Sequence, residues 1–179
     1  MVDQLGSAPS HGIADGSLQA GLLDAVLDSW DRSNRILLNL LRSLPPGGLS
    51  ARVLPGSPTV SQMFMHIHHE RMISVAEEAP EYAGPVPEQE WAIESDASRI
   101  QQLLAQSAAT VRNAVEGRIR SGRQLDRHYD HPALLLQLLL FHESYHHGQI
   151  KLACKAAGTP VSDETAGPLT WDVWRRRSR

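Results

Sequence analysis

The feature that most constrains the fold is the spacing of apolar side chains, which recur at three- and four-residue steps in four long segments. These segments run from about Ser17 to Ser43, from about residue 58 to just before Pro80, from about Ser95 to Gly122, and from Pro132 to Ala157. Such spacing places the apolar side chains on one face of an α-helix. No segment shows the alternation that is typical of a strand. The sequence therefore predicts an all-α protein, and four amphipathic helices of this length favour a four-helix bundle.

Proline and glycine mark the ends of these segments. The run Pro45-Pro46-Gly47-Gly48 stops the first helix. Ser57-Pro58 is typical of an N-cap residue followed by proline in the first helical turn. Pro80, Pro85 and Pro87 lie in a linker of about 15 residues between the second and third helices. The connections are long, so simple up-down topology is not guaranteed.

The chain has the length of a single domain, which we divide into three parts. We expect a loose arm at residues 1–16, the bundle at residues 17–160 and a tail at residues 161–179. Trp171 and Trp174, three residues apart, are expected to lie on a short helix of the tail and to pack on the bundle.

Charge and hydrophobicity exclude several classes of protein. The formal net charge is −3, so there is no basic field of the kind that attracts nucleic acid. No apolar run approaches the ~20 residues of a membrane span, and we expect a soluble protein. Cys154 is the only cysteine, which excludes an internal disulfide, and the N-terminus lacks a signal-peptide pattern. A cytoplasmic location and a buried, inert Cys154 thiol are expected.

Two histidines interrupt the apolar face of the fourth segment. His142 and His146 lie one helical turn apart, about 40° from each other on a helical wheel, in the arc that holds Leu135 and Leu139. His147 lies about 100° further round and is set aside. Burying two imidazoles among leucines is costly unless their nitrogens have partners. Polar neighbours in the core or a shared metal ion would supply them, and two histidines on one face favour the metal ion.

The second segment contains a histidine-rich run from Met65 to Arg71. His66 lies in an apolar arc of this helix, and we expect it to be the third ligand. His69 lies within about 60° of His66 on the wheel and is the alternative. Three neutral imidazoles leave coordination positions open, as catalytic metal sites do. Zinc is the default ion for these ligands, with nickel or another transition metal as alternatives.

The stretch from His142 to His146 also matches the HExxH motif of zinc metalloproteases. In that interpretation Glu143 is the general base, and Glu164 is a third ligand downstream of the pair. A protease of this kind is expected to hold its peptide substrate on the edge of a sheet. Because no strand pattern is found, the protease is the less favoured interpretation.

The motif His-x-x-x-His-x-Gly-Gln, from His142 to Gln149, resembles the DinB-like family of bacterial metal-dependent proteins, as does the upstream His66. The resemblance covers roughly residues 18–157. It implies a four-helix bundle in which His66, His142 and His146 hold a divalent metal. The family includes transferases and isomerases that use low-molecular-weight thiols, and proteins described as hydrolases.

The resemblance implies that a small-molecule substrate meets a thiol or water activated by the metal, and it makes a homodimer an expectation. Gln149, one turn beyond His146, is a candidate for orienting a ligand. Glu70 and Tyr145 are candidate proton donors or hydrogen-bond partners of a ligating histidine. Each of these three residues has a purely structural role as its alternative. A non-catalytic metal-binding or dimerisation bundle is the alternative from a different class.

Overall fold

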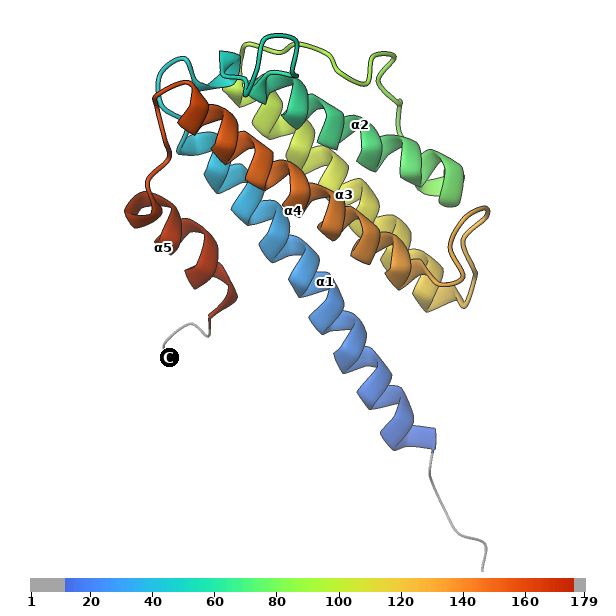
Figure 1. Cartoon of the computed structure of the whole chain (residues 1–179). Helices are drawn as coiled ribbons and strands as arrows, with labels where there is room; N and C mark the ends of the chain where they lie inside the picture. Colours follow the sequence, from blue (N-terminus) through green and yellow to red (C-terminus); the bar gives the residue numbers. More distant parts are fainter. Residues whose placement is uncertain (1–11, 176–179) are drawn as a thin grey trace, which may run out of the picture.

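The computed structural model describes the backbone of residues 12–175 and the side chains of residues 18–175. Over this range the chain forms five α-helices, two short 3-10 helices and no strand (Figure 1). The elements are α1 (Gly12–Arg42), η1 (Gly48–Ser50), α2 (Val60–Glu78), η2 (Pro80–Tyr82), α3 (Ala97–Ser121), α4 (Pro132–Ala156) and α5 (Asp163–Trp174). The predicted all-α class and the four long helices are confirmed. Within the described range, no helix combines the length and the hydropathy needed to cross a membrane.

The four long helices pack as a bundle in which α1 and α2 each contact both α3 and α4. In Figure 1, α1 and α4 run in one direction and α2 and α3 run in the opposite direction. Because α2 and α3 are parallel, the chain must return along the bundle between them. The proline-rich linker makes this return over α2, where Gln62 Nε2 donates to the Trp91 carbonyl at 3.1 Å and Ser61 Oγ donates to the Glu94 carbonyl at 2.5 Å.

The first helix starts earlier than the sequence predicts. α1 begins at Gly12, whereas the expected arm extends to residue 16, and residues 1–11 of that arm lie outside the described residues. Glycine in a helix costs about 1 kcal/mol relative to alanine. Extending an existing helix nevertheless adds one hydrogen bond for each residue that is fixed. The helix therefore continues through Gly16, and the prediction of a loose arm was wrong for residues 12–16.

The second helix starts two residues later than predicted. Thr59 is the N-cap: its Oγ1 accepts the Gln62 backbone N–H at 3.2 Å, and Gln62 Oε1 accepts the Thr59 backbone N–H at 3.0 Å. This reciprocal capping box satisfies two backbone donors at once. Ser57 and Pro58 lie in the preceding loop. The predicted cap at Ser57 was wrong because a single proline signal is weaker than the capping box.

The predicted stop of the third helix and the predicted start of the fourth helix are confirmed. Gly122 ends α3 in the left-handed conformation with φ 66°, which glycine adopts without strain. His131 is the N-cap of α4, and its Nδ1 accepts the Ala133 N–H at 3.1 Å. Pro132 follows in the first turn, where a missing N–H has no cost.

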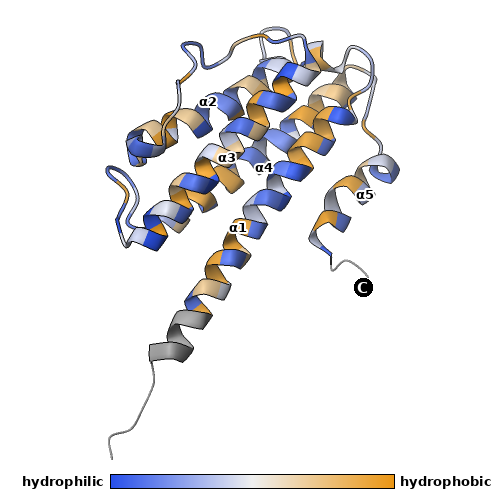
Figure 2. Cartoon of the chain, turned by 180° about the vertical axis from the view of Figure 1, so that it is seen from behind, coloured by the Kyte–Doolittle hydropathy of each residue, from blue (hydrophilic) through white to orange (hydrophobic). Residues whose placement is uncertain are grey.

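The helices carry apolar and polar sides, as the colouring of Figure 2 shows, and the apolar sides form two clusters along the bundle. One cluster lies at the end where α2 begins and includes Phe64 and the fully buried Cys154. The other includes Trp30, which is fully buried and donates from Nε1 to the Ala108 carbonyl at 2.9 Å. The expected burial of Cys154 is confirmed, and burial raises the pKa of its thiol.

A layer of polar side chains separates the two clusters. Arg71 from α2 is fully buried and donates to both carboxylate oxygens of Glu143 from α4, at 2.7 and 2.8 Å. It also donates to the Leu104 carbonyl of α3 at 2.8 Å and to Asn34 Oδ1 of α1 at 3.1 Å. Its guanidinium lies 4.9 Å from the ring centre of Trp30, a cation–π contact. Arg71 thus connects all four helices of the bundle.

The C-terminal helix α5 packs against α1. Asn39 Nδ2 donates to the Leu169 carbonyl at 2.8 Å, and Arg32 donates to the Val173 carbonyl at 2.5 Å. Trp171 is 72% exposed and Trp174 is 46% exposed. The expectation that both tryptophans pack on the bundle was therefore wrong for Trp171. The hydrogen bonds that hold α5 against α1 go to backbone carbonyls of α5 and do not involve the tryptophan side chains.

Replacing Glu143 tests the polar layer. Glu143→Ala leaves the buried Arg71 charge without its partner, which costs about 3–5 kcal/mol of unfolding free energy. The double variant Arg71→Met/Glu143→Leu removes both charges, so it should be more stable than Glu143→Ala. Urea unfolding followed by circular dichroism measures both. A loss below about 1 kcal/mol for Glu143→Ala, the value of an exposed pair, would contradict the role assigned to this ion pair.

Candidate metal centre

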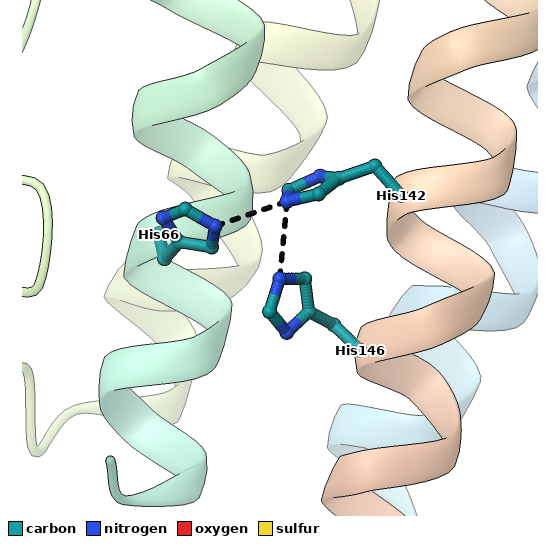
Figure 3. A group of neighbouring side chains, drawn as sticks. All are labelled: His66, His142 and His146. Carbon is teal, nitrogen blue, oxygen red and sulfur yellow. Dashed lines mark hydrogen bonds between the residues drawn. The ribbon is translucent and has the colours of Figure 1, made fainter.

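Three histidine side chains from two helices converge between α2 and α4 (Figure 3). His142 Nε2 lies 3.0 Å from His66 Nε2 and 3.0 Å from His146 Nε2. His66 and His146 are 7% and 5% exposed, and His142 is partly exposed. The three side chains form a group whose nitrogens could hold one metal ion. The structure thus brings together the three residues that the sequence predicts as ligands.

Helix geometry explains this arrangement. His142 and His146 are four residues apart in α4, so their side chains leave the helix on the same face one turn apart. His66 lies on the face of α2 that meets α4, and its ring centre is 4.9 Å from that of His142 and 4.8 Å from that of His146. All three histidines lie within uninterrupted α-helix.

The spacing of the nitrogens fits a metal ion better than a hydrogen-bond network. A neutral imidazole Nε2 carries one proton or one lone pair. His142 Nε2 therefore cannot make a regular hydrogen bond with both of its neighbours. Nitrogens that bind one metal at 2.0–2.1 Å lie about 2.9–3.4 Å from one another. The observed contacts are within this range, so the three residues fit a divalent metal.

Burial keeps two of these rings neutral. Burial, followed by the proximity of His142 and His66, lowers the pKa of His146 to about 4. Burial and His142 also lower the pKa of His66, against the opposing effect of nearby carboxylates. Both rings are therefore uncharged at neutral pH, which leaves their lone pairs free to bind a metal ion.

Two residues of the linker contact His66. Glu90 Oε1 lies 2.9 Å from His66 Nδ1, at ion-pair distance, although the N–H is not aligned for a regular hydrogen bond. Trp91 stacks on the His66 ring with a centroid distance of 4.0 Å and an interplanar angle of 5°. A carboxylate at Nδ1 favours the tautomer that leaves the lone pair on Nε2, facing His142. The sequence did not indicate either contact, because the linker has no periodicity.

The three candidates for catalysis lie around the site. Glu70 is close enough to form a second group of possible ligands with His66 and Glu90, and its Oε1 is 3.5 Å from His69 Nδ1. The ring of Tyr145 is 59% exposed and lies 5.2 Å from the ring of His146. Gln149 is partly exposed and lies close enough to His146 to raise its pKa slightly. Their roles in catalysis stay predictions.

The neighbouring histidines face other surroundings. His69 contacts Glu70 and is absent from the three-histidine group, so the geometry favours His66 over His69. His68 is 4% exposed, and burial, followed by the charge of Arg71, lowers its pKa to about 4. His147 lines a different cavity, between α4, α1 and α5. This agrees with setting His147 aside.

The structure also argues against the protease interpretation. Glu143 is 3% exposed, and both its carboxylate oxygens are bound to Arg71 in the core. It is therefore unable to act as a general base beside the histidines. Glu164 is exposed in the first turn of α5 and does not belong to the three-histidine group. No strand is present in residues 12–175 to hold a peptide.

The fold and the site define a helical-bundle protein with a candidate three-histidine metal centre. A family model, described as the DinB family, matches residues 18–169. The chain therefore belongs to the DinB family, and the resemblance seen in the sequence is confirmed. The matched segment contains all three histidines of the site. No curated protein and no solved structure matches the chain.

The buried histidines predict acid-sensitive stability in the metal-free protein. His68 has an ordinary pKa of 6.5 when unfolded and a pKa of about 4 when folded. The unfolded state therefore binds more protons between these values, and stability falls as the pH falls from about 6.5 to 4, by up to roughly 1.4 kcal/mol per pH unit for each such histidine. His68→Leu should remove part of this loss, because the lowered pKa values of His146, His66 and His147 contribute the rest.

Urea unfolding in the presence of a chelator, at pH 8 and at pH 5, measures this effect. At pH 8 His68 is neutral in both the folded and the unfolded state. The difference in unfolding free energy between wild type and His68→Leu at this pH therefore excludes titration and serves as the reference. An unchanged pH dependence in His68→Leu would show that His68 does not titrate as its burial requires.

Proposed function

We propose that this chain is a metal-dependent enzyme that activates a low-molecular-weight thiol or water to attack an electrophilic small molecule. The observation that carries the proposal is the convergence of three Nε2 atoms, two of them on rings whose pKa is lowered. Three imidazole ligands leave coordination positions open for a substrate or solvent. Zinc is the default ion, with nickel or another transition metal as alternatives.

When bound, a divalent metal supplies the Lewis acidity that makes a thiol or a water a nucleophile at neutral pH. The chain's own residues hold and shield the site. Trp91 covers one face of His66, and Glu90 lies against its Nδ1. Tyr145, exposed beside His146, is the candidate proton donor to a leaving group, and Glu70 is the candidate acceptor near His66.

A non-catalytic metal site is the alternative function. The burial of His66 and His146, with Trp91 stacked on His66, favours it, because a structural site has little need of access. The partial exposure of His142 supports the enzyme, because it leaves a side from which a small molecule can approach. Turnover distinguishes the two.

Metal content and turnover test the proposal together. Wild-type protein without a tag should contain about one divalent metal ion per chain, and His142→Ala should lose it because two imidazoles bind a metal much more weakly than three. His147→Ala is the matched control. It removes a histidine of the same helix that lies next to His146 but outside the three-histidine group, and it should keep the metal. Elemental analysis gives these contents. Equal metal content in wild type and His142→Ala would refute the metal centre.

The reaction is tested with glutathione, bacillithiol and mycothiol in turn, each with a chlorinated aromatic electrophile. Turnover should require the metal and should be lost in His142→Ala. Metal-independent turnover would contradict the mechanism. Full metal occupancy without turnover of any thiol or of a hydrolysable ester would favour the non-catalytic alternative.

Removing the Glu90 carboxylate should weaken metal binding. Loss of a carboxylate that contacts a ligating histidine costs about 10- to 100-fold in metal affinity, so Glu90→Gln should raise the metal dissociation constant by this factor. Glu88→Gln makes the same change in the same linker at an exposed position and should have no effect. Competition with a chromophoric chelator measures both constants. Identical affinities for the two variants would show that the contact with His66 is incidental.

A further inference from the structure

A cavity of about 250 Å³ lies between α1, α4 and α5, and none of the three histidines of the metal centre lines it. We call it the α5 cavity, because α5 forms one of its walls; in Figure 1 this helix lies beside α1 at the edge of the bundle. Pockets for drug-sized molecules have volumes of about 300–1,000 Å³. The α5 cavity is slightly smaller, so it fits a molecule with a single aromatic ring.

The wall that α5 contributes is aromatic. Trp171 and Trp174 are three residues apart, so both indoles leave α5 on the same side, and both line the cavity. They are 72% and 46% exposed, although tryptophan is highly buried on average. Ile36 from α1 adds an aliphatic surface. Exposed indoles that border a cavity offer large apolar faces on which a flat ring can stack.

The wall that α4 contributes is polar. Ser144, His147 and Lys151 recur at steps of three and four residues, so they line the cavity along one face of the helix. His147 Nε2 is shielded from solvent and has no hydrogen-bond partner among the described residues. A buried polar atom without a partner is costly. A ligand with an oxygen atom that reaches this wall can supply the partner.

Lys151 is the charge that a ligand in the α5 cavity would meet. Glu143 also lines the cavity, but both its carboxylate oxygens accept hydrogen bonds from Arg71, which neutralises this charge. Lys151 Nζ lies 3.1 Å from Asp163 Oδ1, and the Asp163 side chain is 98% exposed. An ion pair with so exposed a partner adds little stability. A carboxylate in the cavity can therefore replace Asp163 beside Lys151.

We propose that the α5 cavity binds a small aromatic carboxylate, with its ring against Trp171 and Trp174 and its carboxylate beside Lys151. The ring displaces water from the two indoles, and the carboxylate accepts a charge-assisted hydrogen bond from the ammonium group. A cationic aromatic molecule would be repelled by Lys151, and a neutral one would lack the charge-assisted bond. His147 lies 100° round α4 from His146, so the ligand binds on a different face of the helix from the three histidines.

Nuclear magnetic resonance of the full chain tests where benzoate, the probe for this class of ligand, binds. The chain has four tryptophans, and replacing each with phenylalanine assigns its indole N–H signal. Benzoate should shift the signals of Trp171 and Trp174, both in the protein as purified and after chelation of metal, so the outcome does not depend on the proposed function. Trp91, which stacks on His66, reports separately on the three-histidine site. No shift of Trp171 and Trp174 at millimolar benzoate, or a shift of Trp91 alone, would overturn the proposal.

The two lysines of the chain are a matched pair for testing the charge. Wild type should bind benzoate at least about tenfold more tightly than benzamide, its neutral analogue, and Lys151→Met should remove this difference by weakening benzoate alone. Lys155 lies one turn further along α4 and outside the α5 cavity, so Lys155→Met should have no effect. Equal affinities for benzoate and benzamide in wild type, or unchanged benzoate affinity in Lys151→Met, would overturn the assignment of a carboxylate ligand.

Replacing Trp174 tests the aromatic wall. Trp174→Ala should weaken benzoate and benzamide alike, because both lose the surface on which the ring stacks. Trp174→Phe keeps an aromatic ring and should retain most of the affinity. Circular dichroism checks that both variants are folded. Unchanged benzoate affinity in folded Trp174→Ala would overturn the placement of the ring.

Discussion

The buried ion pair between Arg71 and Glu143 sets how α2 lies against α4. Arg71 is five residues after His66, and Glu143 directly follows His142 in the sequence. A charge buried in the core needs its partner at hydrogen-bond distance, so any slip of α2 along α4 would cost several kcal/mol. The distances of 2.7 and 2.8 Å between the two side chains therefore also fix the level at which His66 meets His142 and His146. The arrangement of the three histidines thus depends on an ion pair between two residues that are not candidate metal ligands.

The same residue explains why a protease motif occurs in a protein with another architecture. The Glu143 side chain leaves α4 about 100° round the helix from His142. In this bundle that direction is the core, where Arg71 binds the carboxylate, whereas the histidines face α2. The spacing of a motif specifies directions around a helix, but only the surrounding fold decides what lies in each direction. The literal match is thus explained by a structural role of Glu143.

Features that repeat along the chain could be predicted from the sequence, and features set by distant contacts could not. The apolar spacing, the proline and glycine stops and the pair His142 and His146 are local signals, and they led to the fold and to His66 as the third histidine. The contacts of Glu90 and Trp91 with His66 depend on the path of the linker, which follows from the parallel direction of α2 and α3. Nothing in the composition of the linker indicates that path. The capping box at Thr59 was also a local signal, and the adjacent Ser57-Pro58 pattern drew the prediction away from it.

The three-histidine site has different surroundings on its two sides, and under the proposed function this would limit how a substrate reaches it. On the α2 side, Trp91 stacks on His66 and closes that face. On the α4 side, Tyr145 and Phe141 are exposed, and Phe141 directly precedes His142 in the sequence. Under the proposed function, a small molecule would therefore approach by way of His142, the least buried of the three histidines.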